Sequence, residues 1–142
     1  MELSNYFDAM GKAKKEYIRC LEPVCKRFRL TQNELTVLLF LHNNPGLDRA
    51  ADIVSCRGIA KSHVSLAVTR LEAQGILTRR YDPADRRACH LVLTEKGTEI
   101  AETGAERQRQ FFEALYVGIS PEERELMRSV ARKIMDNIAS FP

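Results

Sequence analysis

The sequence predicts a mainly α-helical protein that carries one small β-hairpin. Most apolar residues recur at gaps of three and four, which is the spacing of one face of a helix. Only residues 76–81 and 88–93 have the pattern of short strands, and the charged, turn-rich segment 82–87 separates them. The 142 residues contain no internal repeat and no linker rich in Pro, Gly or Ser, so we expect a single domain over residues 1–142.

The N-terminal residues 1–30 predict one long helix. Their apolar positions alternate gaps of three and four, and only Lys14 interrupts the series. These positions are Leu3, Phe7, Met10, Tyr17, Leu21, Val24 and Phe28. Pro23 lacks an amide hydrogen, so we expect the helix to kink or restart near Glu22.

Capping and turn residues mark the next two helices. Thr31–Glu34 is a capping-box sequence, in which a hydroxyl and a carboxylate satisfy amides at a helix end. It begins an apolar helix that the Asn-Asn-Pro-Gly sequence of residues 43–46 ends. Asp48 is expected to cap a short helix over residues 49–56.

Glycines and a proline delimit the remaining helices. A helix is expected over residues 60–74, between the turn-forming Gly58 and Gly75. After the two strands, Thr94 caps a long helix, and Gly118–Pro121 separates it from the last one. The last helix carries an apolar stripe of Leu126, Met127, Val130, Ile134 and Ile138.

In chain order, these elements form a helix-turn-helix followed by a two-stranded wing, between longer helices at both ends. The outer helices are longer than the small central core needs, and their apolar stripes must be buried. A two-fold partner is the economical solution. The predicted fold class is therefore mostly α with a small β-hairpin wing: a winged helix-turn-helix lobe plus N- and C-terminal dimerisation helices.

Positive charge gathers in the middle of the chain. Residues 57–87 hold seven Lys or Arg and three acidic residues, a net charge of +4 in a chain whose total is +3. A basic middle of this kind is expected of an element that binds a polyanion, although charged runs are commonly just solvated faces.

A helical wheel of residues 61–72 separates an apolar face from a polar one. The apolar face, which should point to the core, consists of Val64, Ala67, Val68 and Leu71. Hydroxyls on the opposite face can hydrogen-bond base edges, Arg70 can bind guanine and Leu66 can touch a thymine methyl. The N-terminus of the helix offers free amides to phosphate. The candidate DNA contacts of this helix are Lys61, Ser62, His63, Ser65, Leu66, Thr69 and Arg70.

Arginines gather on or beside the predicted hairpin tip. They are Arg79, Arg80, Arg86 and Arg87. A tip is too exposed for these side chains to gain much from packing, whereas narrow minor grooves favour arginine because their negative potential is enhanced. Asp85 can hold the Arg87 side chain in a charge-assisted pair. Arg79, Arg86 and Arg87 are therefore candidate DNA contacts, and the alternative is a hairpin tip that only adds surface charge.

Five segments occur in a characteristic order and spacing. They are residues 30–34 (Leu-Thr-Gln-Asn-Glu), 58–65 (Gly-Ile-Ala-Lys-Ser-His-Val-Ser), 71–77 (Leu-Glu-Ala-Gln-Gly-Ile-Leu), 82–87 (Asp-Pro-Ala-Asp-Arg-Arg) and 93–97 (Leu-Thr-Glu-Lys-Gly). Together they resemble the MarR family of winged-helix transcription regulators, over nearly the whole chain. The chain departs from the family at Ala60, where Ser or Thr is usual, and at Leu66, where a basic or polar residue is common.

The resemblance implies a homodimer that acts as a repressor on double-stranded DNA. Residues 1–30 and 98–142 would form the interlocked dimerisation helices. Residues 31–97 would form the DNA-binding lobe, which grips one half of a palindromic operator. Arg87 is then expected in the minor groove, with Asp85 as its orienting partner and Arg86 near the backbone.

The resemblance also implies that a small phenolic or anionic effector releases the DNA, from a pocket between the dimerisation helices and the DNA-binding lobe. The sequence identifies neither the effector nor its binding residues. A redox-responsive regulator is an alternative, because Lys26 and Arg27 follow Cys25 and can stabilise a thiolate. The cysteines in question are Cys20, Cys25, Cys56 and Cys89. A winged-helix protein-interaction module is a second alternative, but it should lack arginines at the tip.

Other functions lack the residues they need. No Gly-rich phosphate loop, nucleophile elbow or pair of carboxylates is visible, so we expect neither an enzyme nor a cofactor. The three histidines are scattered and no Cys-x-x-Cys occurs, so no metal site is expected. No apolar run approaches the roughly 20 residues that cross a bilayer, and the N-terminus has no secretory signal. We therefore expect a cytoplasmic protein with reduced thiols and no membrane contact.

Overall fold

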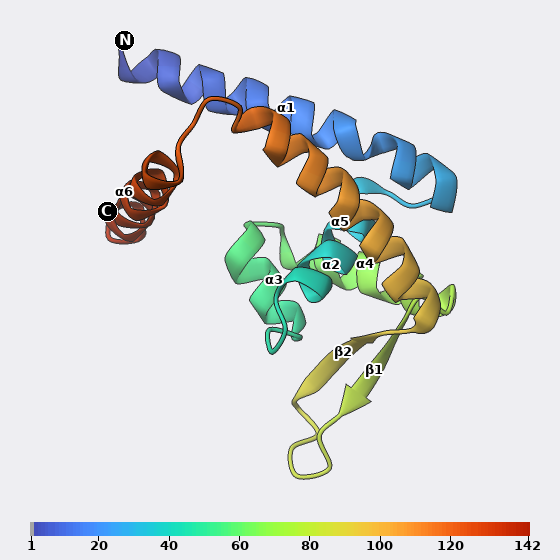
Figure 1. Ribbon diagram of the computed structural model, residues 1–142. Helices are drawn as coiled ribbons and strands as arrows, with labels where there is room; N and C mark the ends of the chain where they lie inside the picture. The colour runs from blue at the N-terminus through green and yellow to red at the C-terminus, as the bar shows by residue number, and fades with distance from the viewer. Residues whose placement is uncertain (1) are drawn as a thin grey trace. The chain divides into compact units, whose positions relative to one another are not determined.

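The computed structural model describes residues 2–142, and Figure 1 shows the course of the chain. The elements in chain order are α1 (Leu3–Phe28), α2 (Gln32–Asn43), α3 (Ala50–Arg57), α4 (Lys61–Ala73), β1 (Leu77–Tyr81), β2 (Cys89–Leu93), α5 (Glu95–Leu115) and α6 (Pro121–Ala139). This is the predicted fold class, a mainly helical chain with one hairpin. The chain divides into two compact units, one that ends at Phe111 and one that comprises Phe112–Pro142.

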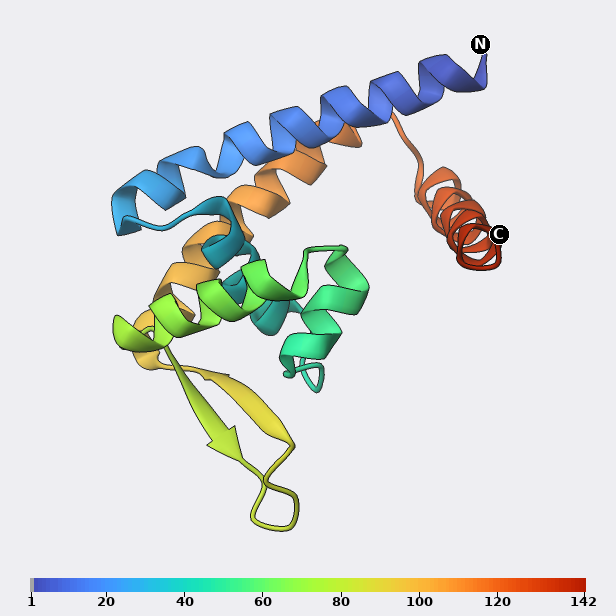
Figure 2. The same cartoon turned by 180° about the vertical axis from the view of Figure 1, so that it is seen from behind.

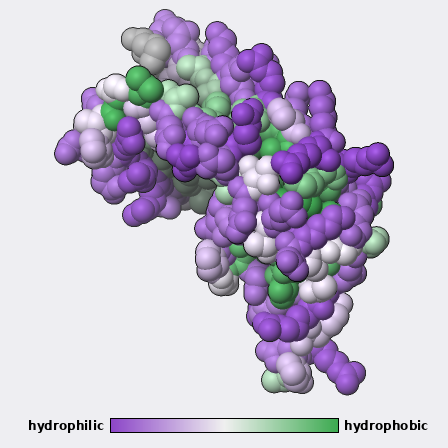
Figure 3. All heavy atoms as spheres, turned by 45° about the vertical axis from the view of Figure 1, so that its right-hand side comes forward, coloured by the Kyte–Doolittle hydropathy of each residue, from purple (hydrophilic) through white to green (hydrophobic). Residues whose placement is uncertain are grey.

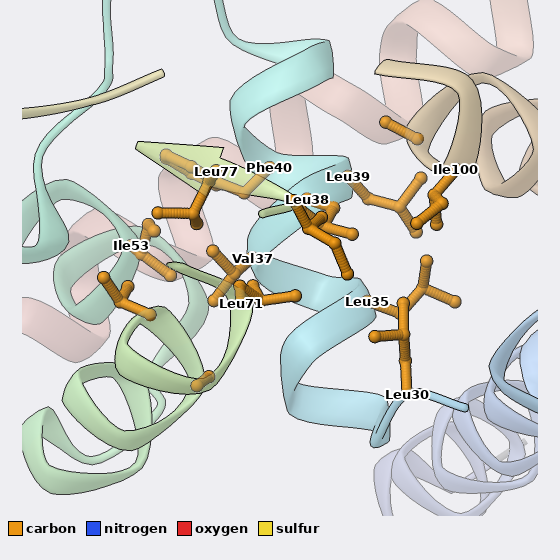
Figure 4. Close-up of a cluster of buried hydrophobic side chains, with 14 of the residues drawn as sticks. Leu30, Leu35, Val37, Leu38, Leu39, Phe40, Ile53, Leu71, Leu77 and Ile100 are labelled. Atoms are coloured by element: carbon orange, nitrogen blue, oxygen red, sulfur yellow. The ribbon is translucent and has the colours of Figure 1, made fainter. Parts of the chain in front are cut away.

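Helix α2 lies at the centre of the first unit. It is apolar on most of its sides, and such a helix must be covered by neighbours on every side. In Figure 4, Val37 of α2 lies near Leu71 of α4, whereas Leu39 points toward Ile100 of α5. The helices and the wing therefore share one continuous core. Its fully buried side chains include Leu35, Val37, Leu38, Phe40, Ile53, Val64, Leu71, Ile76, Leu77 and Ile100.

The capping box at the start of α2 is confirmed. The Glu34 backbone N–H donates to the Thr31 hydroxyl at 3.2 Å, and the Thr31 N–H donates to the Glu34 carboxylate at 2.9 Å. The expected restart of α1 near Glu22 is wrong, because the helix continues through Pro23 to Phe28. Proline removes one helical hydrogen bond, and the buried Leu21 and Val24 on either side of it hold both halves of the helix on the core.

The expected cap at Asp48 is also wrong. Arg49 is the residue before α3, and its N–H donates to the Asp52 carboxylate at 3.0 Å. The Asp48 carboxylate instead pairs with Nδ1 of His90 at 2.7 Å, and its carbonyl accepts the N–H of Leu91 at 2.8 Å. The loop before α3 therefore anchors the outer edge of the wing.

The wing is an antiparallel pair in which Leu77 faces Leu93 at the base and Tyr81 faces Cys89 near the tip. It projects from the C-terminal end of α4, as Figure 2 shows. Its base is tightly joined to the start of α5, where a Cβ on Gly97 would lie 2.0 Å from the Ile76 carbonyl oxygen. Only glycine fits at this contact.

The second unit contains the end of α5 and all of α6. Ser120 caps α6 through a capping box with Glu123, and Pro121 occupies the first turn, as predicted. The Arg124 guanidinium lies over the Tyr116 ring, 5.0 Å from its centroid, and thereby holds the turn between the two helices. Every side chain of α6 is described, and none is buried. The predicted apolar stripe of α6 is therefore entirely exposed in the single chain.

On the face shown in Figure 3, hydrophilic side chains predominate and apolar ones reach the surface in separate patches. Among residues 2–142, no helix combines the length and the hydropathy that crossing a bilayer requires.

Candidate nucleic-acid interface

Helix α4 presents two chemically different faces. Its apolar face is buried as the helical wheel predicts, through Val64, Ala67, Val68 and Leu71. The opposite face is exposed and consists of small polar groups, two basic side chains and Leu66, which is 50% exposed. The exposed predicted contacts are Lys61, Ser62, His63, Ser65, Leu66, Thr69 and Arg70.

The N-terminus of α4 has no side-chain cap. Ala60 precedes the helix, and it supplies no hydrogen-bond acceptor beyond its carbonyl. The His63 N–H donates to the Ala60 carbonyl at 2.9 Å, so the N–H groups of Lys61 and Ser62 are the ones left for an external partner. Because these groups carry the positive end of the helix dipole, they suit an anion such as a phosphate.

A small hollow separates the exposed face of α4 from the start of α2. Its volume is about 120 Å³, and three predicted contacts, His63, Leu66 and Arg70, line one side of it. Thr31, Asn33 and Glu34 of α2 line the other side. Asn33 is exposed and was not predicted as a site residue, because only the packing of α2 on α4 brings it to this surface.

The wing exposes Arg80 in the outer part of β1, and its tip exposes Arg86 and Arg87. The Asp85 carboxylate accepts the backbone N–H of Arg87 at 3.0 Å, so it acts on the tip backbone and not on the guanidinium. Asp82 similarly accepts the N–H of Ala84 at 2.9 Å. These two contacts give the tip a defined turn while its arginine side chains extend into solvent.

Arg79 differs from the other arginines of the wing. It lies in the middle of β1, and its side chain is only 30% exposed. Its Nη2 donates to the Thr69 hydroxyl at 3.2 Å, and its Nε lies 3.9 Å from the Glu72 carboxylate. Arg79 therefore does not belong to the tip, because it is bound to α4.

Comparison with known proteins agrees with this geometry. A sequence model described as the MarR family matches residues 30–88, from the start of α2 to the wing. Over these residues the chain is similar to the MarR family. It is 27% identical over 109 residues to the uncharacterized HTH-type transcriptional regulator YdgJ of Bacillus subtilis (strain 168), a match that covers 77% of this chain and 66% of YdgJ. It is also 27% identical to the transcriptional regulator HosA of Escherichia coli O111:H-, over 75% of this chain and 78% of HosA.

Solved structures of MarR-family proteins share the fold. The MarR-family regulator from Silicibacter pomeroyi superimposes with a TM-score of 0.82 at 22% identity, over 98% of this chain and 92% of that one. BpsR from Bordetella bronchiseptica gives 0.70 at 24% identity, over 92% and 98% of the two chains. Both of the curated relatives named above are transcriptional regulators.

A larger cavity lies elsewhere in the chain. Its volume is about 430 Å³, and it lies among α1, α2, α5 and the segment from α3 to α4. Lys14 and Arg57 are the charged residues of its lining, and the rest is apolar or neutral. The lining includes Tyr17, Ile18, Leu21, Gln32, Thr36, Leu39, Cys56, Ile59 and Gln108. This lining suits a small ligand with an apolar body and a negative charge.

The polar groups of this cavity are connected to the end of α2. The Gln108 amide donates to the Tyr17 hydroxyl, and its oxygen accepts the Asn43 amide at 2.8 Å. Helices α1, α5 and α2 therefore meet at Gln108.

Cys20 and Cys25 of α1 both have a raised thiol pKa. Burial raises the pKa of the Cys25 thiol, and the neighbouring Glu22 and Glu34 raise it further. Burial also raises the pKa of Cys20, against a smaller lowering by Arg107. A peroxide-sensing thiol needs the opposite shift, because the thiolate is the reactive form. The predicted role of Lys26 and Arg27 in stabilising a Cys25 thiolate is therefore wrong.

The remaining titratable clusters offer no metal centre. Within residues 2–142, no group of three His, Cys, Asp or Glu side chains is placed to hold an ion. His90 of β2 is paired with Asp48.

Proposed function

We propose that this regulator binds duplex DNA sequence-specifically as a homodimer and represses transcription. The observation that carries the proposal is the joint exposure, on one lobe, of the polar face of α4 and the Arg86–Arg87 tip. Residues 31–97 form the DNA-binding lobe, and residues 1–30 and 98–142 supply the dimer contacts. The protein acts in the cytoplasm, on the palindromic operator of a promoter from which the bound dimer excludes polymerase.

Helix α4 enters the major groove with its exposed face toward the bases. Ser62, Ser65 and Thr69 are short enough to let the helix approach the base edges, and Arg70 can bind a guanine. The uncapped first turn, together with Lys61 and His63, binds the phosphate backbone. Leu66 provides an apolar contact that matches a thymine methyl group.

The wing reaches the neighbouring minor groove. Arg87 enters the groove, where the negative potential favours a guanidinium, and Arg86 contacts the backbone. Asp85 orients Arg87 through its backbone N–H. The minor groove distinguishes mainly A·T from G·C pairs, so the wing adds affinity and a preference for groove shape.

The exposed apolar side chains of the outer helices support the homodimer. Phe7 and Met10 of α1 are 66% and 48% exposed, and every residue of the α6 stripe is at least 40% exposed. Exposed apolar surface on helices that carry regular stripes marks a protein interface. A two-fold axis through this interface gives the operator its palindromic symmetry.

A small phenolic or anionic effector in the 430 Å³ cavity releases the DNA. Lys14 and Arg57 can neutralise its charge, while Ile18, Leu21 and Leu39 contact its apolar body. Regulation of DNA binding by 6-hydroxynicotinic acid is described for BpsR, and a complex with p-coumaroyl-CoA for CouR from Rhodococcus jostii RHA1. Both ligands combine an aromatic ring with anionic groups.

Footprinting on genomic DNA tests the proposal directly. The purified protein is mixed with sheared genomic DNA that includes its own promoter, and the protected sequences are determined. We expect a palindrome with half-sites about 34 Å apart, one helical turn of DNA. Protection without symmetry would contradict the dimer, and the absence of any protection at low salt would contradict DNA binding.

A further inference from the structure

Arg79 connects the wing to the recognition helix α4. We infer that it is a positioning residue, which sets the direction of the wing and does not itself bind DNA. This inference rests on the proposed DNA binding and changes the role that the sequence predicts for Arg79. It also gives Thr69 a second role, as the attachment point on α4.

The guanidinium of Arg79 binds two side chains on one turn of α4. Nη2 donates to the Thr69 hydroxyl at 3.2 Å, and Nε lies 3.9 Å from the Glu72 carboxylate. Thr69 and Glu72 are three residues apart, so their side chains lie on the same side of the helix. Arg79 thus holds one defined turn of the recognition helix.

The neighbouring Arg80 provides an internal comparison. Successive side chains of a strand point to opposite faces, so Arg80 points away from the face that carries Arg79. Arg80 is exposed and faces His90 across the hairpin. Arg79 is half-buried, and the adjacent Glu72 carboxylate offsets its charge. Of the two arginines, Arg80 is the one free to meet a phosphate.

Few other contacts hold the middle of the wing on the rest of the lobe. Leu77 fixes the base of β1 in the core, and the Leu91 N–H fixes β2 to the Asp48 carbonyl. Arg79 faces Leu91 across the hairpin, so it is the corresponding attachment on the β1 side. Beyond it, the strand and the tip extend toward solvent.

The length of the hairpin magnifies a change at its base. A strand advances about 3.3 Å per residue, so the end of β1 at Tyr81 lies about 7 Å beyond Arg79, and a rotation of about 10° there moves this end by about 1 Å and the turn beyond it by more. A displacement of this size is enough to break a hydrogen bond. Loss of the Arg79 contacts should therefore misplace Arg87 relative to α4 on the DNA.

The test compares R79A, T69V and the double variant with R80A as the matched control. An operator is first selected from random duplexes with the wild-type protein, and dissociation constants are then measured over a range of salt concentrations. We expect R79A and T69V each to weaken operator binding about tenfold, because each breaks the same charge-assisted hydrogen bond. The double variant should be weakened by less than the sum of the two single effects, because both changes remove the Thr69–Arg79 hydrogen bond, while R79A also removes the ion pair with Glu72 and T69V also removes a hydroxyl that faces the bases.

The salt dependence separates positioning from phosphate binding. A lost phosphate contact lowers the slope of log K against log salt by about 0.9. We expect R79A to keep the wild-type slope. R80A should lower the slope, because Arg80 is the arginine that can meet a phosphate. A second double-mutant cycle combines R79A with R87A. Its effects on operator affinity should be non-additive, because an Arg87 that is already misplaced contributes little to binding. A role in folding stability alone would leave the cost of R87A unchanged.

Several results would overturn the inference. They are a reduced slope in R79A, additive effects of R79A and T69V, or an unchanged affinity of T69V. If R79A does not fold, as judged by circular dichroism, T69V and its double-mutant cycle with R87A test the positioning role instead. The T69V substitution does not change the charge of the protein. If the wild-type protein enriches no duplex and binds none at low salt, the proposed DNA binding fails, and this result is distinct from the others.

Discussion

Helices α2 and α6 bury their apolar side chains to opposite extents. In α2, Leu35, Val37, Leu38, Leu39 and Phe40 are almost completely buried. In α6, no side chain is buried although the helix has a regular apolar stripe. The difference shows that the unit ending at Phe111 has a core of its own, whereas the stripe of α6 still lacks a covering surface.

The largest expected effect comes from a charge on the α6 stripe. Ile134→Asp should prevent dimer formation, because burial of an unpaired carboxylate in an apolar interface is costly. Operator affinity should fall by a factor of about 100 or more, since the two lobes would bind independently. Analytical ultracentrifugation and binding to the selected operator measure the two effects.

Ser129→Asp is the matched control for this change. It adds the same charge to α6 on the side away from the stripe, so dimer and affinity should be retained. A dimeric Ile134→Asp protein with full affinity would show that α6 is not the interface. The contrast between α2 and α6 would then need another explanation.

The second prediction concerns the unit that ends at Phe111, at the contact between Gly97 and Ile76. Gly97→Ala should destabilise the protein by about 3 kcal/mol, because the new Cβ meets a backbone carbonyl that cannot move aside. Gly11→Ala is the control, since nothing lies within 4 Å of a Cβ at Gly11 and alanine favours the helix. Urea unfolding gives both free energies of unfolding, and equal values for the two variants would contradict the tight contact at Ile76.

The sequence predicted elements bounded by local signals better than contacts between distant segments. The capping boxes at Thr31 and Ser120 and the buried face of α4 are all local patterns, and all are confirmed. The sequence predicts a helix cap at Asp48 because that role is local, but the fold brings Asp48 to His90, 42 residues away.

The same limit applies to the candidate site. The sequence predicts that Arg79 belongs with the tip arginines, because sequence distance alone does not tell a strand centre from a turn. Its contact with Thr69 depends on how the hairpin packs on α4. Asn33 was missed because it joins this surface only through the packing of α2.

The third prediction separates binding from stability at the exposed tip. Arg87→Ala should weaken operator binding by about 1–3 kcal/mol at fixed salt. The free energy of unfolding should not change by more than about 0.5 kcal/mol, because the side chain is exposed. Fluorescence anisotropy and urea unfolding measure the two quantities, and unchanged affinity would contradict the role of the wing.

The smallest expected effect is a difference in alkylation rate between a buried and an exposed cysteine. Cys25 is buried with a raised pKa, whereas Cys56 is exposed at the end of α3. Iodoacetamide at pH 8 should therefore alkylate Cys56 at least about tenfold faster than Cys25, because access and thiolate content set the rate. Peptide mass spectrometry over time gives both rates, and faster modification of Cys25 would show that α1 opens from the core.

The raised pKa of Cys25 also predicts how stability depends on pH. The folded protein holds the thiol proton more tightly than the unfolded chain, whose thiol titrates near its ordinary value of 9.0. The stabilisation is therefore complete below this pH and declines as the pH rises through the folded pKa. Cys25→Ala should lose less stability than the wild type between pH 8 and pH 10, as measured by urea midpoints. Equal losses would mean that Cys25 ionises in the folded protein as readily as in the unfolded chain.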